Sequence, residues 1–271
     1  MIRLNEMPLD FESRRKILPL LPAFPSEPEM SEFESAFLCG ALKTFRPKKI
    51  LEVGVAGGAT TAIILQTLEE IGEPYEMHSI DLAKNFHRDE TKPSGFMGMF
   101  AKEKILGELR GVHKFHLGKI LPQVIDEIGG DIDFVILDTV HMLPGELLDF
   151  LAVLPYLTDN AVVVLHDVTL HQLREHDNNA TDVLFGAVTA EKFLNFQTDE
   201  YLFRYPNIAA FRINEQTVEN IENIFIALTL RWKYFPSKQL VIYREHYRRF
   251  YSDALCEIFQ DAIDMNGYNF A

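Results

Sequence analysis

Residues 51–60 read LEVGVAGGAT, and this stretch decides the fold. A short apolar run ends near Glu52, a turn with three glycines follows, and a helical pattern begins near Thr60. Glycine lets a backbone turn sharply and lets a ligand touch the main chain. In open α/β sheets the ligand crevice lies outside the carboxyl ends of the strands. The stretch therefore predicts a binding site for a nucleotide-like molecule at the end of a strand.

Outward from this turn, β-rich runs alternate with helical patterns. Apolar runs without polar alternation indicate strands that are covered on both faces. The pattern predicts an α/β protein with a doubly wound, mostly parallel, Rossmann-like sheet and helices on both faces. The expected strands are 48–55, 75–82, 112–118, 132–138, 161–168 and 207–213, and the expected helices between them are 59–72, 121–128 and 145–156.

Helical additions are expected on both sides of this domain. Residues 1–28 are rich in proline and predict an irregular surface arm, whereas Ser31 and Glu34 have the spacing of a capping box at the start of a helix. Toward the other end, residues 215–232 and 237–263 show helical spacing. The expected division is an N-terminal arm and helix at 1–47, a central domain at 48–214 and a C-terminal helical pair at 215–271.

Composition narrows the classes of protein and partner. The 271 residues are 47% hydrophobic and 24% charged, which excludes a disordered or collagen-like chain. The net charge of −14 opposes binding to nucleic acid or to an anionic membrane. The two cysteines, Cys39 and Cys256, are far apart and form no CxxC pair. They fit a reducing compartment, and a cytoplasmic protein is expected.

The Gly-rich turn leaves two cofactors open. A dinucleotide fingerprint would have glycine where Ala56 and Ala59 stand, and the Glu52 carboxylate would repel a pyrophosphate. An NAD-dependent oxidoreductase is thus weakened as an alternative. The acid, the spacer and the Gly-rich loop resemble motif I of class I S-adenosylmethionine-dependent methyltransferases.

This resemblance implies a set of donor-binding residues. Asp81 closes the second expected strand, where an acid can accept hydrogen bonds from both ribose hydroxyls of a nucleoside, although an aspartate there can also be a simple turn residue. Gly118 follows the third strand and would lie near the adenine. The implied donor-binding residues are Glu52, Gly54, Ala56, Gly57, Gly58, Asp81, Gly118 and Asp138.

Acids and histidines follow the fourth and fifth expected strands. Asp138 is followed by His141, and the fifth strand ends in His166 and Asp167. The region resembles a bacterial subgroup of methyltransferases, related in layout to catechol O-methyltransferase and to cephalosporin-hydroxylase-like and macrolide sugar methyltransferases. The resemblance implies a divalent metal on Asp138, His166 and Asp167.

The chain departs from that subgroup in ways that bear on the metal. Its members often have a second acid two positions after the first, where Val140 stands here, and an acid in place of His166. An imidazole ligand would suit Mn, Fe or Zn better than Mg. Without a metal, His141 or His166 could act as a general base, with Asp138 or Asp167 orienting the imidazole. These residues could also be polar strand ends that bind only the backbone.

Other segments bear on the substrate. The long connection 83–99 fits either a lid over the crevice or a plain surface loop. His171, His176 and Asp177 could extend a metal site or could be loop residues. The region around Trp232 could pack in the core or form a contact in a homo-oligomer.

The function expected from the sequence is S-adenosylmethionine-dependent methyl transfer. The acceptor would be a hydroxyl, less readily an amine, of a small molecule or sugar, and His141, His166 and Asp167 would be the catalytic residues. A noncatalytic module that binds S-adenosylmethionine or a partner is the remaining alternative.

Overall fold

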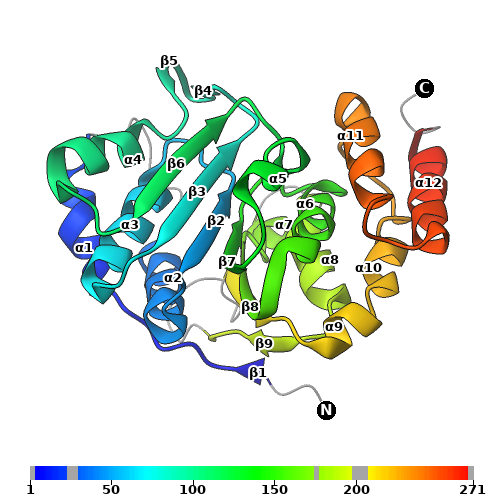
Figure 1. Cartoon of the computed structure of the whole chain (residues 1–271), viewed down its shortest axis with the longest axis horizontal. Helices are drawn as coiled ribbons and strands as arrows, with labels where there is room; N and C mark the ends of the chain where they lie inside the picture. Colours follow the sequence, from blue (N-terminus) through cyan, green and yellow to red (C-terminus); the bar gives the residue numbers. More distant parts are fainter. Residues whose placement is uncertain (1–3, 23–29, 174–176, 197–206, 268–271) are drawn as a thin grey trace.

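A computed structural model describes residues 4–22, 30–173, 177–196 and 207–267 of the chain. An eight-stranded sheet forms its centre, in the order β1-β9-β10-β8-β7-β2-β3-β6, and a separate two-stranded hairpin pairs β4 with β5 (Figure 1). The strands are β1 (Leu4–Asn5), β2 (Lys49–Val53), β3 (Glu76–Asp81), β4 (Asn85–Phe86), β5 (Asp89–Pro93), β6 (Val112–Leu117), β7 (Ile132–Leu137), β8 (Leu157–His166), β9 (Glu191–Phe193) and β10 (Ile208–Arg212).

The order of the strands creates a switch point beside the Gly-rich turn. From β2 the chain moves outward to β3 and then β6, and it returns to place β7 and β8 on the other side of β2. These five strands are parallel, whereas β10 runs antiparallel to both β8 and β9. Ligands of open α/β sheets bind where the strand order reverses in this way, here between β2 and β7.

Helices cover both faces of the sheet (Figure 1). The helices α1, α2 and α3 pack together on one face, and α6, α8 and the C-terminal helices lie on the other. The helices are α1 (Glu12–Ile17), α2 (Glu32–Phe45), α3 (Ala59–Ile71), α4 (Phe96–Phe100), α5 (Ile125–Ile128), α6 (Gly145–Val153), α7 (Leu170–Leu173), α8 (Ala180–Ala187), α9 (Glu215–Glu219), α10 (Glu222–Ala227), α11 (Ser237–Tyr247) and α12 (Asp253–Gly267).

The central strands bury side chains on both faces, which explains their unbroken apolar sequences. Successive residues of a strand point to opposite faces. Thus Ile50 and Phe134 pack in the core under α2 and α3, whereas Leu51 and Val135 pack in the core under α6. The predicted doubly wound fold is confirmed, and all six expected strands are present.

The N-terminal arm is more ordered than its sequence predicts. Ser31 and Glu34 form the expected capping box of α2. The prediction of irregular structure before it was wrong for α1, where Ile17 is fully buried, and for β1, which pairs with β9. A polar network also fixes α1, because Glu70 of α3 accepts hydrogen bonds from Ser13 and Lys16.

The C-terminal helices belong to the same core as α6. The prediction of a single helix over residues 237–263 was wrong, since the chain turns between α11 and α12. That turn lets the hydroxyl of Tyr251 donate to the backbone oxygen of Leu151 at 2.6 Å. Tyr247 donates to the backbone oxygen of Leu148 in the same way, at 2.7 Å. Trp232 is buried in this core, as one of its two expected roles requires.

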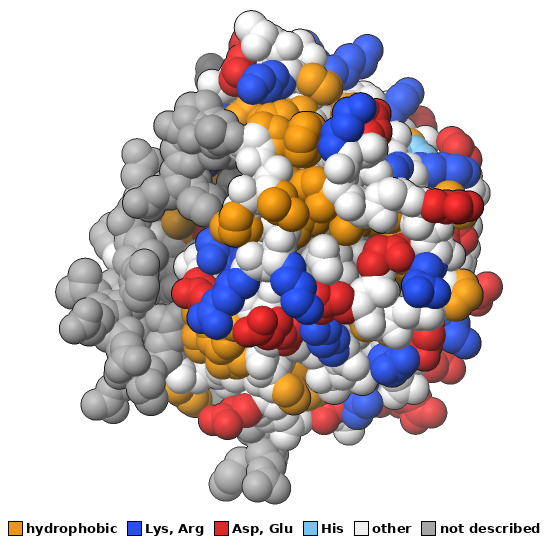
Figure 2. All heavy atoms as spheres, turned by 90° about the vertical axis from the view of Figure 1, so that its left-hand side faces the viewer, with side chains coloured by type: hydrophobic (Ala, Val, Ile, Leu, Met, Phe, Trp, Pro, Cys, Tyr) orange, Lys and Arg blue, Asp and Glu red, His pale blue; other side chains and the backbone are white. Residues whose placement is uncertain are grey.

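The surface carries both signs of charge. On the face shown in Figure 2, acidic and basic side chains are interspersed and apolar side chains gather in the upper part. Across the described ranges, none of the helices is both long enough and apolar enough to span a bilayer.

Candidate active site

A cavity of about 670 Å³ lies at the carboxyl ends of the parallel strands. This volume is typical of small-molecule sites. The Gly-rich turn, the segments after β3, β7 and β8, and the start of α11 all contribute to its wall. The cavity therefore lies where the sequence predicts a ligand.

The first glycine of the turn is required by close packing. Gly54 has φ +94°, and a Cβ atom there would lie 1.8 Å from the backbone oxygen of Asp138. Gly54 and Ala56 both line the cavity. The turn thus brings its own backbone and that of the strand end after β7 together at the cavity wall.

The second half of the turn faces protein instead of the cavity. A Cβ atom on Gly58 would lie 2.7 Å from Cα of Gly95. The backbone oxygen of Gly57 accepts a hydrogen bond from the Met97 N–H at 3.0 Å. Neither Gly57 nor Gly58 lines the cavity. These two glycines admit the segment before α4, so the geometry does not support their predicted contact with a donor.

Glu52 lies behind the turn. Its side chain is fully buried, and Oε2 accepts hydrogen bonds from Thr61 at 2.8 Å and from Ser79 at 2.6 Å. It is not part of the cavity wall. The carboxylate therefore ties β2 to α3 and β3, and its predicted place among the donor-binding residues finds no support in this geometry.

Asp81 lines the cavity and organises the turn. Oδ2 accepts the backbone N–H groups of Val55 and Ala56 at 3.0 and 2.9 Å. Oδ1 accepts the N–H of Ala83 at 2.7 Å. Each carboxylate oxygen has two lone pairs, so both lone pairs of Oδ2 are used and Oδ1 can accept one further hydrogen bond from the cavity. Gly118 supports Asp81 from behind by donating to its backbone oxygen, and the adjacent Lys119 lines the cavity.

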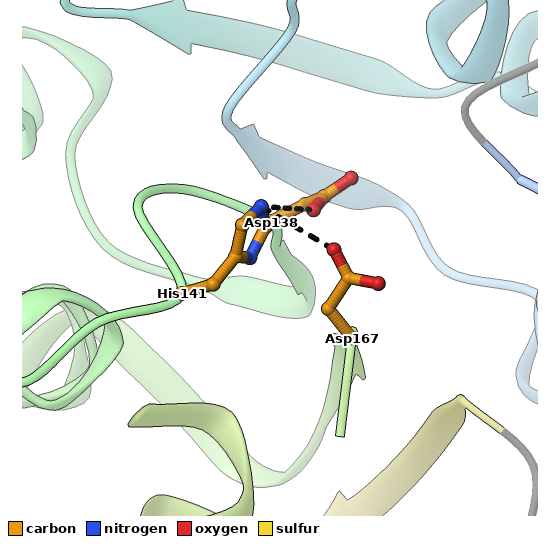
Figure 3. A group of neighbouring side chains, drawn as sticks. All are labelled: Asp138, His141 and Asp167. Atoms are coloured by element: carbon orange, nitrogen blue, oxygen red, sulfur yellow. Dashed lines mark ion pairs between the residues drawn. The ribbon is translucent and has the colours of Figure 1, made fainter. Parts of the chain in front are cut away.

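Asp138, His141 and Asp167 converge at the other end of the cavity (Figure 3). Nε2 of His141 lies 3.3 Å from Oδ2 of Asp167 and 3.9 Å from Oδ1 of Asp138. The three side chains offer ligand atoms within 4.8 Å of one another, which is close enough for a metal ion. The same arrangement also suits an imidazole that takes up a proton between two carboxylates.

His166 is placed differently from the sequence-based expectation. The residue is 3% exposed, Nδ1 lies 3.1 Å from Oδ1 of Asp138, and Nε2 lies 3.5 Å from Oε2 of Glu34. Both ring nitrogens thus face carboxylates. The set of ligand atoms that converges within metal-binding distance contains His141 in place of the predicted His166.

The charge state of His166 also disfavours its predicted role as a base. Burial alone would lower the pKa of its imidazole, but the charges of Asp138 and Asp167 outweigh burial and raise that pKa well above its usual value. In the same way, His166 lowers the pKa of Asp138 although burial acts to raise it. An imidazolium cannot accept another proton, so His141 is the better candidate base.

The sequence reasoning missed Glu146 and Asp149 of α6 and Tyr243 of α11, which contact residues of the candidate site. Oε1 of Glu146 accepts a hydrogen bond from the backbone N–H of His141 at 2.8 Å. The same oxygen lies 3.5 Å from Nδ1 of the His141 ring. Asp149, one turn further along α6, accepts hydrogen bonds from Thr139 at 3.2 Å and from Tyr243 of α11 at 2.6 Å. The spacing of Glu146 and Asp149 on one helix face was the available signal.

The buried carboxyl of Asp149 should make the stability of the protein depend on pH. Burial raises the pKa of its carboxyl from 3.8 to about 7. The folded state therefore binds a proton that the unfolded state has released between these values, so this group's contribution to stability falls as the pH rises. We expect the free energy of unfolding of the wild type, measured with urea, to fall by up to about 1.4 kcal/mol per pH unit across this range, relative to that of Asp149→Asn. Parallel pH profiles of the two proteins would contradict the assignment.

The segment after β3 forms part of the cavity mouth. The hairpin β4–β5 and the residues beside it place His87, Arg88 and Ser94 in the wall. Of the other histidine cluster, His171 is outside the wall, His176 falls outside the described residues, and Asp177 pairs with Lys233 at 2.7 Å. This ion pair engages Asp177 away from the converging carboxylates.

A family model matches the part of the chain that contains this site. A model of the methyltransferase domain family matches residues 51–168, which include the Gly-rich turn, Asp81, Asp138 and Asp167. No curated protein matches the sequence.

Three similar solved structures are distant in sequence. The O-methyltransferase TomG from Streptomyces achromogenes, in complex with S-adenosylmethionine, is 19% identical, with a TM-score of 0.49 over 77% of this chain and 92% of that chain. An O-methyltransferase from Bacillus cereus in complex with S-adenosylhomocysteine is 16% identical, with a TM-score of 0.46 over 74% and 90%. The Podospora anserina methyltransferase PaMTH1, bound to S-adenosylhomocysteine, is 13% identical, with a TM-score of 0.47 over 78% and 91%.

The family match and the strand order together decide between the classes left open by the sequence. The match covers the turn, the strands that flank the switch point and the acidic strand ends, and it favours a methyltransferase over an oxidoreductase. Residues 51–168 of this chain thus match the methyltransferase domain family, and the sheet has the strand order of a doubly wound, Rossmann-like methyltransferase fold.

Proposed function

We propose that the protein transfers a methyl group from S-adenosylmethionine to a hydroxyl of a small molecule or sugar. One observation carries the proposal: a single cavity joins the turn at Gly54 and Asp81 to the converging Asp138, His141 and Asp167. A nucleoside donor bound at the first end would direct its methyl group toward the second. Holding donor and acceptor in this geometry supplies most of the acceleration of such a displacement.

The donor would be held by groups that already line the cavity. Asp81 would accept a ribose hydroxyl through the remaining lone pair of Oδ1, and the backbone at Gly54 and Ala56 would contact the methionine portion. Of the eight predicted donor-binding residues, four lie in the wall, namely Gly54, Ala56, Asp81 and Asp138. The proposal rests on these four and not on Glu52, Gly57, Gly58 or Gly118.

The acceptor hydroxyl would react beside His141. As its oxygen attacks the methyl carbon, the carbon–sulfur bond breaks and the thioether leaves with the electron pair. The hydroxyl proton passes to Nε2 of His141, and Asp167 at 3.3 Å stabilises the imidazolium that forms. Glu146, at 3.5 Å from Nδ1, orients the ring from the other side.

Binding experiments test the donor first. We expect S-adenosylhomocysteine to bind in calorimetry and NAD to show no binding at the same concentration. Release of S-adenosylhomocysteine in the presence of a panel of sugars and catechols would then identify the acceptor. If neither S-adenosylmethionine nor S-adenosylhomocysteine binds, the proposed function is wrong.

Asp81→Asn should weaken the binding of S-adenosylhomocysteine at least tenfold. The substitution removes the charge from the hydrogen bonds to a ribose hydroxyl and to the turn, and charged acceptors make roughly twice the contribution of neutral ones. Asp89→Asn, on the adjacent hairpin and bonded locally to Thr91, is the matched control and should leave affinity unchanged. Equal affinity of Asp81→Asn and the wild type in calorimetry would remove Asp81 from the donor site.

A further inference from the structure

The acceptor end of the cavity, beside His141, is bounded by a helix from outside the matched domain. Helix α11 places Gln239 and Tyr243 in the wall, four residues apart and therefore on one face of the helix. Tyr234 and Pro236, which precede α11, also line the cavity. Because the family match ends at residue 168, the family says nothing about this wall, and its preference for a ligand must be derived from these residues.

The polar groups of this wall are mainly acceptors of hydrogen bonds. The hydroxyl of Tyr243 donates its hydrogen to Oδ1 of Asp149 at 2.6 Å, and Oδ2 of Asp149 accepts from Thr139 at 3.2 Å. One lone pair remains on each carboxylate oxygen, and the Tyr243 oxygen is also an acceptor. Gln239 is half-buried, and its side-chain amide has no hydrogen-bond partner among the described residues. A ligand that presents hydroxyl hydrogens would satisfy these groups.

Charge is divided unevenly along the cavity wall. Of the described residues that line the cavity, Arg88 and Lys119 are the only arginine and lysine, and they follow β3 and β6 at the donor end, where the Lys119 N–H also bonds to the backbone of Asp81. Three aspartates line the acceptor end, namely Asp138, Asp149 and Asp167. Even a charged His166 ring would offset only one of these carboxylates. A negatively charged ligand would therefore be repelled at the acceptor end and would find no lysine or arginine of the described wall there.

We propose that the acceptor end takes hydroxylated molecules without a negative charge and excludes those that carry a carboxylate or a phosphate. Asp149 and the oxygen of Tyr243 accept hydrogens from the hydroxyl groups of the acceptor. Gln239, one turn earlier on α11, sets the charge that this part of the wall presents. These three residues determine specificity. The inference rests on the proposed function for the identity of the acceptor end, but binding of probe molecules tests it without turnover.

Matched probes test the charge preference. Glucose and glucuronate share a ring and differ by one carboxylate, and so do catechol and 3,4-dihydroxybenzoate. We expect NMR titrations of the S-adenosylhomocysteine complex at pH 8, above the pKa of about 7 of the Asp149 carboxyl, to show the anionic member of each pair binding at least tenfold more weakly than the neutral member. Equal binding within both pairs, or no binding of any of the four probes at millimolar concentrations, would overturn the inference.

A positive charge placed on α11 should reduce this preference. Gln239→Lys adds a cation to the wall, so glucuronate and 3,4-dihydroxybenzoate should bind at least tenfold more tightly than they bind to the wild type. Ser237→Lys adds the same charge at an exposed residue that does not line the cavity, and this matched control should leave the affinity of all four probes unchanged. Equal effects of the two substitutions would contradict the placement of Gln239 in the acceptor wall.

Tyr243→Phe tests the same wall without adding a charge, and it covers the case in which Gln239→Lys does not fold. The substitution keeps the ring and removes the oxygen that bonds to Asp149. We expect catechol and glucose to bind several-fold more weakly, with the affinity for S-adenosylhomocysteine within about twofold of the wild type. Tyr247→Phe, which also loses a hydroxyl on α11 but does not line the cavity, should bind the probes as the wild type does. Wild-type affinity of Tyr243→Phe for both neutral probes would overturn the assigned wall.

Binding of S-adenosylhomocysteine separates this inference from the proposed function. If the nucleoside fails to bind while the protein alone prefers the neutral probes over the anionic ones, the proposed function fails and the charge preference stands. If the nucleoside binds and the anionic probes bind as tightly as the neutral ones, the inference fails and the proposed function stands.

Discussion

His141→Asn is expected to lower kcat for methyl transfer by about 10²- to 10⁴-fold, the range that a positioned general base contributes. Nε2 of His141 is the ring nitrogen that lies at the cavity beside Asp167, and asparagine has no group that can take up the proton. Asparagine suits the backbone at this position, because His141 has φ +61° and asparagine tolerates the left-handed region. Affinity for S-adenosylhomocysteine should stay within about twofold of the wild type.

The control for this variant is another histidine near the site. His171→Asn also removes an imidazole, but His171 is not part of the cavity wall, so kcat should not change. The measurement is the rate of S-adenosylhomocysteine release with the acceptor found in the panel. Full activity of His141→Asn would show that the proton leaves by another route, with Asp138 or Asp167 as the next candidates.

Gly54→Ala should destabilise the protein by about 3 kcal/mol or more and abolish donor binding. A Cβ atom would lie 1.8 Å from the backbone oxygen of Asp138, so the turn or the end of β7 must move. The left-handed φ of +94° adds strain of about 1–3 kcal/mol. The overlap is with backbone atoms of Asp138, which cannot rotate away as the end of a side chain could.

Gly72→Ala separates the two causes. Gly72 ends α3 with φ +76°, but a Cβ atom there meets nothing within 4 Å. Gly72→Ala should therefore lower the free energy of unfolding only by the strain of the left-handed backbone, about 1 kcal/mol. Urea unfolding of both variants measures the difference. Equal destabilisation would mean that the contact between Gly54 and Asp138 relaxes without cost and that the turn is more adaptable than its geometry indicates.

The parts of the fold that could be predicted are those set by local sequence. The turn at Gly54, the capping box at Ser31 and the central strands follow from patterns within about ten residues. The strand ends at Asp81, Asp138 and Asp167 follow as well, because carboxyl ends of parallel strands meet at one edge of the sheet. For this reason the location of the cavity and several of its wall residues could be predicted.

The parts that could not be predicted depend on long-range packing. His166 looked like a ligand or base because a single sequence does not show that Glu34 lies against its other ring nitrogen. Gly58 was predicted to contact the donor because the sequence does not show what lies against it. In the structure its neighbour is Gly95, which follows the β4–β5 hairpin. Tyr243 belongs to the cavity wall only because α11 docks on α6.

The docking of the C-terminal helices on α6 has a consequence for how this enzyme can diversify. Tyr243, Tyr247 and Tyr251 bond to α6 along one side, and Tyr243 also borders the cavity. Exchanging the C-terminal helices for helices from another protein would change the wall of the cavity and uncover α6 at the same time. New substrate preferences are therefore more accessible to point changes on the inner edge of α11 than to recombination of whole segments.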